Sequence, residues 1–187
     1  MFGDIARFLL NTVFTLFGAA LLLRAWLQVV RLPPYNPVSN AVFQVTNWIV
    51  LPLRKILPST KNIDWASIVA ALIAALVYVV LMVLLTGIDP LSLAPTLAIV
   101  ALLTVIKWAL NLIIWMTILM ALLSWLNPRS PAMPILFQLT APFLSPLRRV
   151  VPQIGGIDLS PILLFVIVQV LLMVVTRAAV QLTYFVI

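Results

Sequence analysis

The chain has 187 residues, of which 65% are hydrophobic and only 8% are charged, with a formal net charge of +7. Soluble domains carry about a quarter charged residues, so this composition excludes a water-facing exterior and indicates an integral membrane protein. The acidic residues are four aspartates, and Glu, His and Cys are absent, which removes imidazole bases, thiolate nucleophiles and Cys/His metal sites.

We therefore expect no enzymatic activity, no catalytic residue, no metal and no cofactor. The positive charges lie beside long apolar runs, so the expected acidic partner is anionic phospholipid, and we expect no direct contact with nucleic acid.

Four apolar runs are long enough to cross a bilayer, which needs about 20 residues. The first is interpreted as an uncleaved anchor, because no small-residue cleavage site follows it. The third, residues 91–126, would reach about 50 Å as one helix. Either that helix is strongly tilted, or residues 91–106 form a separate surface-lying or re-entrant piece. The other three runs cover residues 8–30, 65–86 and 160–186.

The chain contains two similar halves. Residues 52–58 (Pro-Leu-Arg-Lys-Ile-Leu-Pro) recur 94 positions later as residues 146–152 (Pro-Leu-Arg-Arg-Val-Val-Pro). At the same displacement, Phe43-Gln44-x-Thr46 matches Phe137-Gln138-x-Thr140, and Ile63-Asp64 matches Ile157-Asp158. Two spans in each half give both halves one orientation, which makes them parallel repeats.

An amphipathic helix is predicted before each basic segment, lying in the interface with its apolar face towards the lipid. The stripe in the first half is Val38, Ala41, Val42, Val45, Trp48 and Ile49, and the second half has Ile135, Leu136, Leu139 and Phe143.

The predicted fold is all-α: about four transmembrane helices as two parallel tandem repeats, each with an interfacial amphipathic segment between its spans. The first repeat covers residues 1–88 (span 8–30, amphipathic segment 38–58, span 65–86), an apolar connector covers 89–106, and the second repeat covers 107–187 (span 107–126, amphipathic segment 132–152, span 160–186).

These paired Pro-Leu-Arg-[Arg/Lys]-x-x-Pro segments, the Ile-Asp that follows each, and Tyr35-Asn36-Pro37 resemble the YggT (YlmG-like) family of membrane proteins. The sequence departs from the family pattern at Trp48, where the second half keeps Pro142. The resemblance implies a multi-pass protein of the bacterial inner membrane without established enzymatic activity. It also implies associations with osmotic or potassium stress and with cell division, and, in plastid relatives, with cytochrome b6 maturation and nucleoid organisation.

Three groups of charged residues are the candidate sites. Basic pairs in both segments either determine topology or bind anionic lipid or an acidic partner. Two aspartates before spans either cap the helices or pair with an arginine. Charges within apolar runs are functional candidates, although snorkelling to the headgroups is the simpler interpretation. The basic pairs are Arg54, Lys55, Arg148 and Arg149. The two aspartates are Asp64 and Asp158, and the charges within apolar runs are Arg24, Lys107 and Arg177.

The second span carries alanines on one face, which suits close helix packing within the chain or in a homo-oligomer. They are Ala66, Ala70, Ala71, Ala74 and Ala75.

The predicted function is structural: assembly or organisation of the bacterial cytoplasmic membrane, with the basic motifs engaging anionic lipid or a membrane protein complex. The positive-inside rule places the basic loops in the cytoplasm and the termini outside. The alternative is a small channel or transporter, in which the Pro-containing segments re-enter the membrane.

Overall fold

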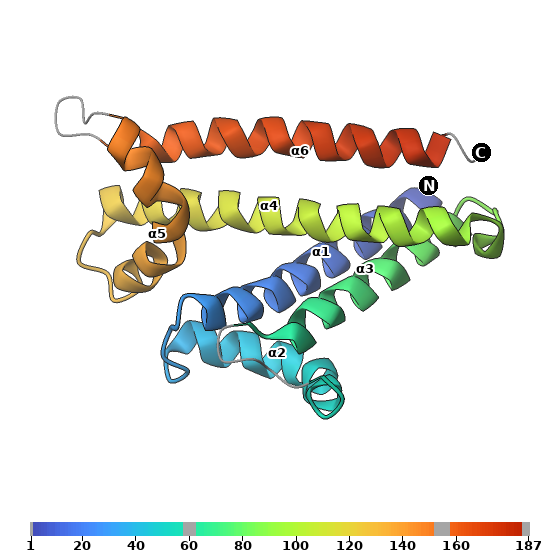
Figure 1. Cartoon of the computed structure of the whole chain (residues 1–187), viewed down its shortest axis with the longest axis horizontal. Coiled ribbons are helices and arrows are strands. Elements are labelled where there is room, and N and C mark those ends of the chain that lie inside the picture. The colour runs from blue at the N-terminus through green and yellow to red at the C-terminus, as the bar shows by residue number, and fades with distance from the viewer. Residues whose placement is uncertain (1, 58–62, 152–157, 185–187) are drawn as a thin grey trace. The chain divides into compact units, whose positions relative to one another are not determined.

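The computed structural model describes residues 2–57, 63–151 and 158–184, and these residues form helices without strands (Figure 1). The elements are α1 (Phe2–Val29), α2 (Pro37–Arg54), α3 (Trp65–Leu84), the 3-10 helix η1 (Pro90–Leu93), α4 (Ala94–Leu126), α5 (Met133–Val150) and α6 (Ser160–Tyr184). Pro58, Lys61, Pro152 and Ile157, which belong to the predicted motifs and loops, lie outside the described residues.

Four of the helices are long and apolar enough to cross a membrane, which confirms the predicted multi-pass, all-helical class. These candidate spans are Gly3–Val29, Trp65–Leu84, Ala94–Leu126 and Ser160–Leu182.

The third apolar run is one continuous helix. Helix α4 extends over 33 residues from Ala94 to Leu126, and only the short η1 precedes it. The alternative of a separate piece at residues 91–106 is therefore wrong, and the predicted connector has no boundary at residue 106. After Pro95 in the first turn of α4, no proline or glycine follows that would interrupt the helix. At about 1.5 Å per residue α4 is about 50 Å long, so it must tilt or project beyond a hydrocarbon core of about 30 Å.

The chain divides into two compact units. Unit 1 comprises residues 1–109 and 175–187, and unit 2 comprises residues 110–174.

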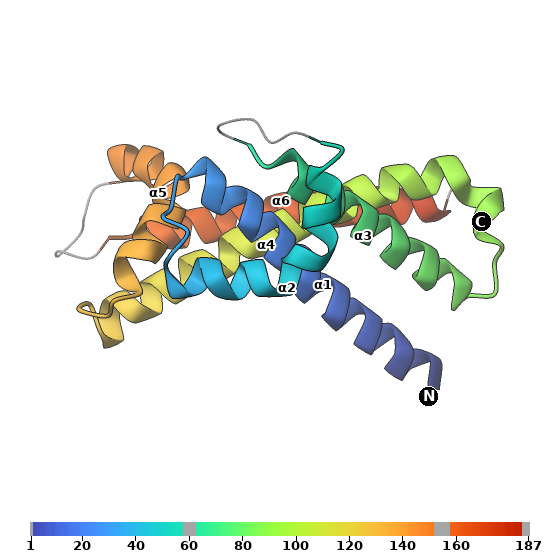
Figure 2. The same ribbon diagram turned by 90° about the horizontal axis from the view of Figure 1, so that it is seen from below.

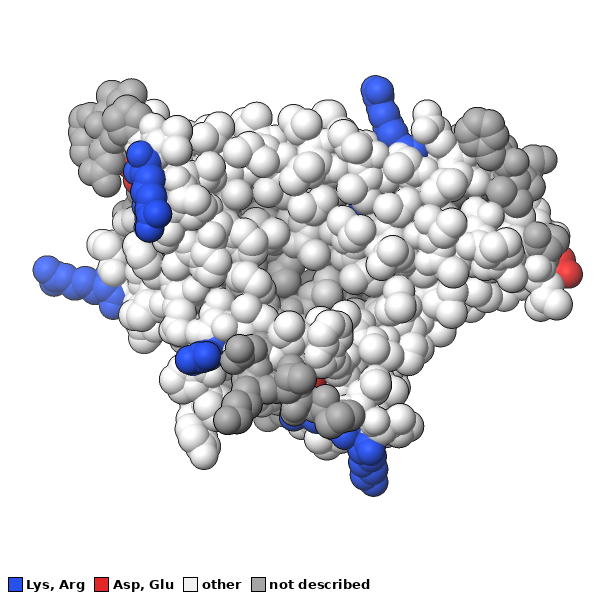
Figure 3. All heavy atoms as spheres, in the orientation of Figure 1, with Lys and Arg blue, Asp and Glu red and all other residues white. Residues whose placement is uncertain are grey.

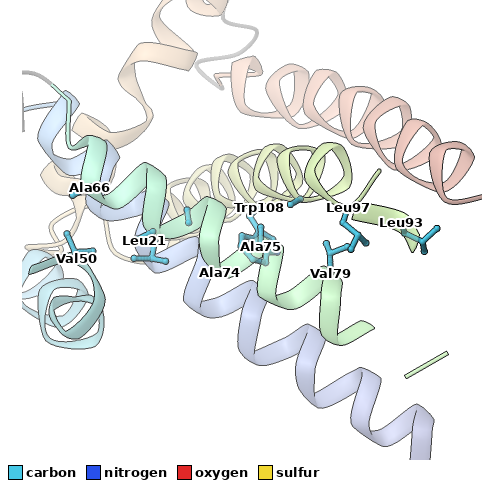
Figure 4. Close-up of a cluster of buried hydrophobic side chains, with 12 residues drawn as sticks. Leu21, Val50, Ala66, Ala74, Ala75, Val79, Leu93, Leu97 and Trp108 are labelled. Atoms are coloured by element: carbon cyan, nitrogen blue, oxygen red, sulfur yellow. The ribbon is translucent and has the colours of Figure 1, made fainter. Parts of the chain in front are cut away.

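Unit 1 has a core built on small side chains. The alanine face of α3 is buried inside the unit, where it packs against α1 and the first half of α4 (Figure 4). Small residues let helix backbones approach closely, and in a bilayer such packing replaces the hydrophobic effect as the force between helices. Gly18 of α1 lies under the Trp108 ring, so close that an added Cβ would be 2.1 Å from a ring carbon.

Unit 2 has a core of larger side chains from α4, α5 and α6. Its buried members are Ile114, Met120, Leu144, Leu164 and Val168.

Helices α2 and α5 connect the spans of their units. Asn36 caps α2 by accepting a hydrogen bond from the Ser39 backbone N–H at 2.8 Å, and Pro37 occupies the first turn. Both helices bend along their length in Figures 1 and 2. Prolines inside a helix remove a backbone hydrogen bond and cause such bends; α2 contains Pro52, and α5 contains Pro142 and Pro146.

The face of α2 that packs on the protein overlaps only in part with the predicted apolar stripe, because, of its members, Val42 is buried and Ile49 packs against the unit 1 core. The buried residues are Ser39, Val42, Thr46 and Val50, whereas Val45 and Trp48 are exposed. In α5, by contrast, the predicted stripe faces the protein: Leu139 is buried, and Leu136 and Phe143 pack against the unit 2 core.

Candidate functional site: two arginine–aspartate junctions

The first junction forms where α2 ends and α3 begins. Arg54 Nη2 donates to Oδ2 of Asp64 at 2.5 Å. Asp64 is also the N-cap of α3, since its carboxylate accepts from the backbone N–H of Ser67 and, at 2.8 Å, from the Ser67 hydroxyl. One carboxylate therefore both starts the span and holds the basic end of α2.

Arg24 of α1 also enters this junction. Its Nη1 donates to Thr46 Oγ1 at 2.8 Å and to Asn47 Oδ1 at 2.9 Å, and its Nε lies 3.6 Å from Asp64 Oδ2. The guanidinium carbon is 4.9 Å from the centre of the Phe43 ring, within the range of a cation–π contact. The residue is only 3% exposed. Snorkelling of Arg24 to the headgroups was the simpler interpretation of the sequence, and it is wrong because three polar partners hold this side chain inside the protein.

The first junction carries more positive than negative charge. Burial opposes ionisation of Asp64, but hydrogen bonds from Arg54 and Ser67, with the charge of Arg54, lower the pKa of this carboxyl below its ordinary value. Two guanidiniums thus share one ionised carboxylate, and Nε of Arg24 makes no hydrogen bond to any described residue.

The second junction repeats the first pair at the end of α5. Arg148 Nε donates to Asp158 Oδ2 at 2.7 Å, and Asp158 Oδ1 accepts from the Ser160 backbone N–H at 2.9 Å, where α6 begins. Burial opposes ionisation here too, but the hydrogen bonds from Ser160 and Arg148 lower the pKa of Asp158. The guanidinium of Arg148 lies over Phe137, with 4.7 Å between its central carbon and the ring centre.

The two junctions differ in the contacts of their equivalent threonines, Thr46 and Thr140. Thr46 accepts from Arg24, whereas Thr140 Oγ1 lies 3.1 Å from the Met120 sulfur and donates to its own helix. No second arginine joins the Arg148–Asp158 pair among the described residues, and both partners are about a quarter exposed. The carboxylate of the second junction is therefore more open to its surroundings than Asp64, which is 1% exposed.

The other predicted residues lie outside these contacts. Lys55 and Arg149, which follow the paired arginines, are exposed. Arg177 is exposed on α6, and Lys107 is half-buried on α4. Figure 3 shows basic side chains projecting singly from a largely uncharged surface. The described residues contain no group of three or more acidic, His or Cys side chains placed to hold a metal ion.

Sequence reasoning did not predict that Arg24 contacts Thr46, Asn47 and Asp64. A signal was present in the repeat, because Phe43 and Thr46 recur as Phe137 and Thr140. A repeated polar residue one helical turn from Val42 and Val50 indicates a buried polar contact.

A family described as CCB3/YggT matches residues 4–85 and again residues 99–179. The protein YggT of Escherichia coli K12 is 38% identical over 165 residues, which cover 88% of this chain and 85% of the relative. A protein encoded in the proC 3′ region of Vibrio alginolyticus is 37% identical over 163 residues, 87% of this chain and 88% of its own. A Haemophilus influenzae protein is 36% identical over 160 residues, 84% of each chain. The names of these relatives state no activity. No solved structure matches the chain.

Proposed function

We propose a function for this chain, which belongs to the CCB3/YggT family: it is a structural protein of the bacterial cytoplasmic membrane that holds two basic helix ends against anionic lipid. The family and the four apolar helices make it a multi-pass membrane protein and confirm the resemblance identified from the sequence. The proposed role requires no chemical reaction.

The observation that carries the proposal is one arrangement found twice. In each unit the arginine of the basic motif pairs with an aspartate ten residues later, at the start of the following span. This pairing fixes the helix end to the span, so the next basic residue projects outward. Lys55 and Arg149 are these projecting residues.

Outward cations at a span end lie at the level of lipid phosphates. Each Lys or Arg near an anionic leaflet contributes about 1 kcal/mol to attraction. We propose that α2 and α5 lie in the interface, on the cytoplasmic side, with both termini outside. The excess of basic residues in these two segments supports this orientation.

The two units are proposed to be parallel tandem repeats. The displacement of 94 residues between the basic motifs, the two separate matches to one family and the paired junctions all support this proposal. Two junctions on one chain would present two cationic points to the same leaflet, or to an acidic membrane protein lying there. An assembly role in osmotic stress or cell division is part of the proposal.

Removal of the projecting charges tests the function. In the variant Lys55→Gln/Arg149→Gln both ion pairs stay intact, and the control Arg7→Gln/Arg177→Gln removes the same charge from other exposed positions. The anionic phospholipid and the membrane proteins retained in mild detergent are measured by mass spectrometry. We expect the first variant to retain less of either, and the control to behave as the unmodified protein. Equal retention by all three proteins would overturn the proposal.

A further inference from the structure

An apolar groove lies between α4 and α6 in unit 2. It has a volume of about 190 Å³, larger than the roughly 150 Å³ apolar cavity that accepts a benzene-sized molecule in another protein. Its walls are Thr117, Ile118 and Ala121 of α4 with Pro161, Ile162 and Phe165 of α6. An α-helix with side chains is about 10 Å across, so this space suits a single hydrocarbon chain better than a protein helix.

Unit 1 has a small residue at the place on α3 that matches Phe165. At the displacement of 94, Phe165 corresponds to Ala71, which is fully buried in the alanine face of α3. Phe165 is 38% exposed and Ile162 is 60% exposed. Phe165 in place of a small residue removes the close packing seen around Ala71 in unit 1 and leaves open hydrocarbon-sized space.

Positive charge lies at one end of this groove. Pro161 follows Ser160, whose backbone N–H donates to Asp158, and Asp158 in turn holds Arg148. Arg149 is adjacent and exposed. Residues 110–174 contain three basic residues, the third being Arg129, and a single acidic residue, Asp158. The start of α6 adds the positive end of a helix dipole.

We propose that this groove holds one acyl chain of an anionic phospholipid whose phosphate contacts Arg149 beside the Arg148–Asp158 pair. An apolar groove with excess positive charge at one end matches an amphiphile with an anionic head. The inference rests on the proposed function, and it adds a defined site for the lipid in unit 2 alone.

The test compares groove variants by native mass spectrometry in mild detergent with added phosphatidylglycerol or phosphatidylcholine of the same acyl chains. Ala121→Phe fills the groove, and the control Ala98→Phe adds the same bulk at an exposed α4 position in unit 1. Ile162→Ala removes an exposed wall, so it tests the groove without requiring new bulk to fit.

The unmodified protein and Ala98→Phe are expected to retain phosphatidylglycerol in preference to phosphatidylcholine. Ala121→Phe is expected to lose the retained phosphatidylglycerol, and Ile162→Ala to bind it more weakly. Arg149→Gln is expected to bind phosphatidylglycerol about fivefold more weakly, because one interfacial cation contributes about 1 kcal/mol.

Unchanged lipid retention in both Ala121→Phe and Ile162→Ala would overturn the proposal that the groove holds an acyl chain. If Lys55→Gln/Arg149→Gln still lowered the retention of anionic lipid, the proposed function would stand without the groove site. A bound mass equal to a second copy of the chain or to another protein, lost in Ala121→Phe, would also overturn the lipid as occupant.

Discussion

Arg24 and Asp64 are 40 positions apart in sequence, yet Nε of the arginine lies 3.6 Å from Oδ2 of the aspartate inside unit 1. Both side chains are almost completely buried. Arg24 belongs to α1, Asp64 begins α3, and the α2 residues Thr46 and Asn47 complete the contact. The cluster therefore fastens α2 to both spans of the unit, whereas the described residues of the second junction show no such third attachment.

Removal of the buried Asp64 carboxylate should destabilise the protein more than removal of the Asp158 carboxylate. Asp64→Asn leaves two guanidiniums without a counter-charge, one of them buried, and should cost about 3–5 kcal/mol. Asp158→Asn breaks a partly exposed pair and should cost about 1 kcal/mol or less. Thermal unfolding of the detergent-solubilised variants measures the difference. Equal losses for the two variants would show that the Arg24 contact contributes nothing.

The two equivalent threonines should also differ. Thr46→Val removes an acceptor for the buried Arg24 guanidinium and should destabilise the protein by about 1.5–3 kcal/mol. Thr140→Val removes a hydroxyl whose neighbours are its own helix and a methionine sulfur, so its cost should be below about 1 kcal/mol. The same unfolding assay compares this matched pair, and a larger loss for Thr140→Val would contradict the arrangement.

Packing of α4 on α1 should depend on Gly18. An alanine Cβ there would meet the buried Trp108 ring, so Gly18→Ala should cost about 1–3 kcal/mol through displacement of the ring. Gly3→Ala in the same helix meets no atom within 4 Å and should be neutral or slightly stabilising. Partial restoration of thermal stability in Gly18→Ala/Trp108→Leu would identify the clash as the cause, and no destabilisation by Gly18→Ala would contradict it.

Stability should fall in acid through both aspartates. Each folded-state pKa is lowered below the value of about 3.9 expected in the unfolded chain, so the folded protein binds fewer protons. The stabilisation is complete above about pH 5 and is lost as the pH falls through about 4 and below. Unfolding temperatures between pH 3 and 7 should show this decline, with a flatter profile for Asp64→Asn. Identical profiles for that variant and the unmodified protein would refute the assignment.

Much of the fold follows from the sequence because lipid imposes simple requirements. Apolar runs of sufficient length must be helices, since backbone groups in hydrocarbon have no other partners. The alanine face of α3 similarly predicted close packing, although only the structure shows that its partners lie within the chain.

The candidate site was less accessible to sequence reasoning. The repeat predicted that Asp64 and Asp158 matter and that each could meet an arginine. It could not predict Arg24, because that residue is not part of the repeated motif and an isolated arginine near a span end usually reaches the headgroups. The buried face of α2 was also hidden, because it mixes Ser39 and Thr46 with apolar residues. The continuity of α4 depends on the absence of proline and glycine after Pro95 in its first turn, over a length that exceeds the bilayer.

Cysteine accessibility along α2 tests the central claim that the basic helices lie on the cytoplasmic surface, and the chain has no native cysteine to interfere. Single variants Gln44→Cys, Trp48→Cys and Val42→Cys place the thiol on the exposed polar, exposed apolar and buried faces. An impermeant maleimide is applied to right-side-out and inverted vesicles. The account predicts reaction of Gln44→Cys from the cytoplasmic side alone, with Trp48→Cys covered by lipid and Val42→Cys covered by protein. Reaction of Gln44→Cys from the outer side, or from both sides, would contradict the account and favour a re-entrant channel.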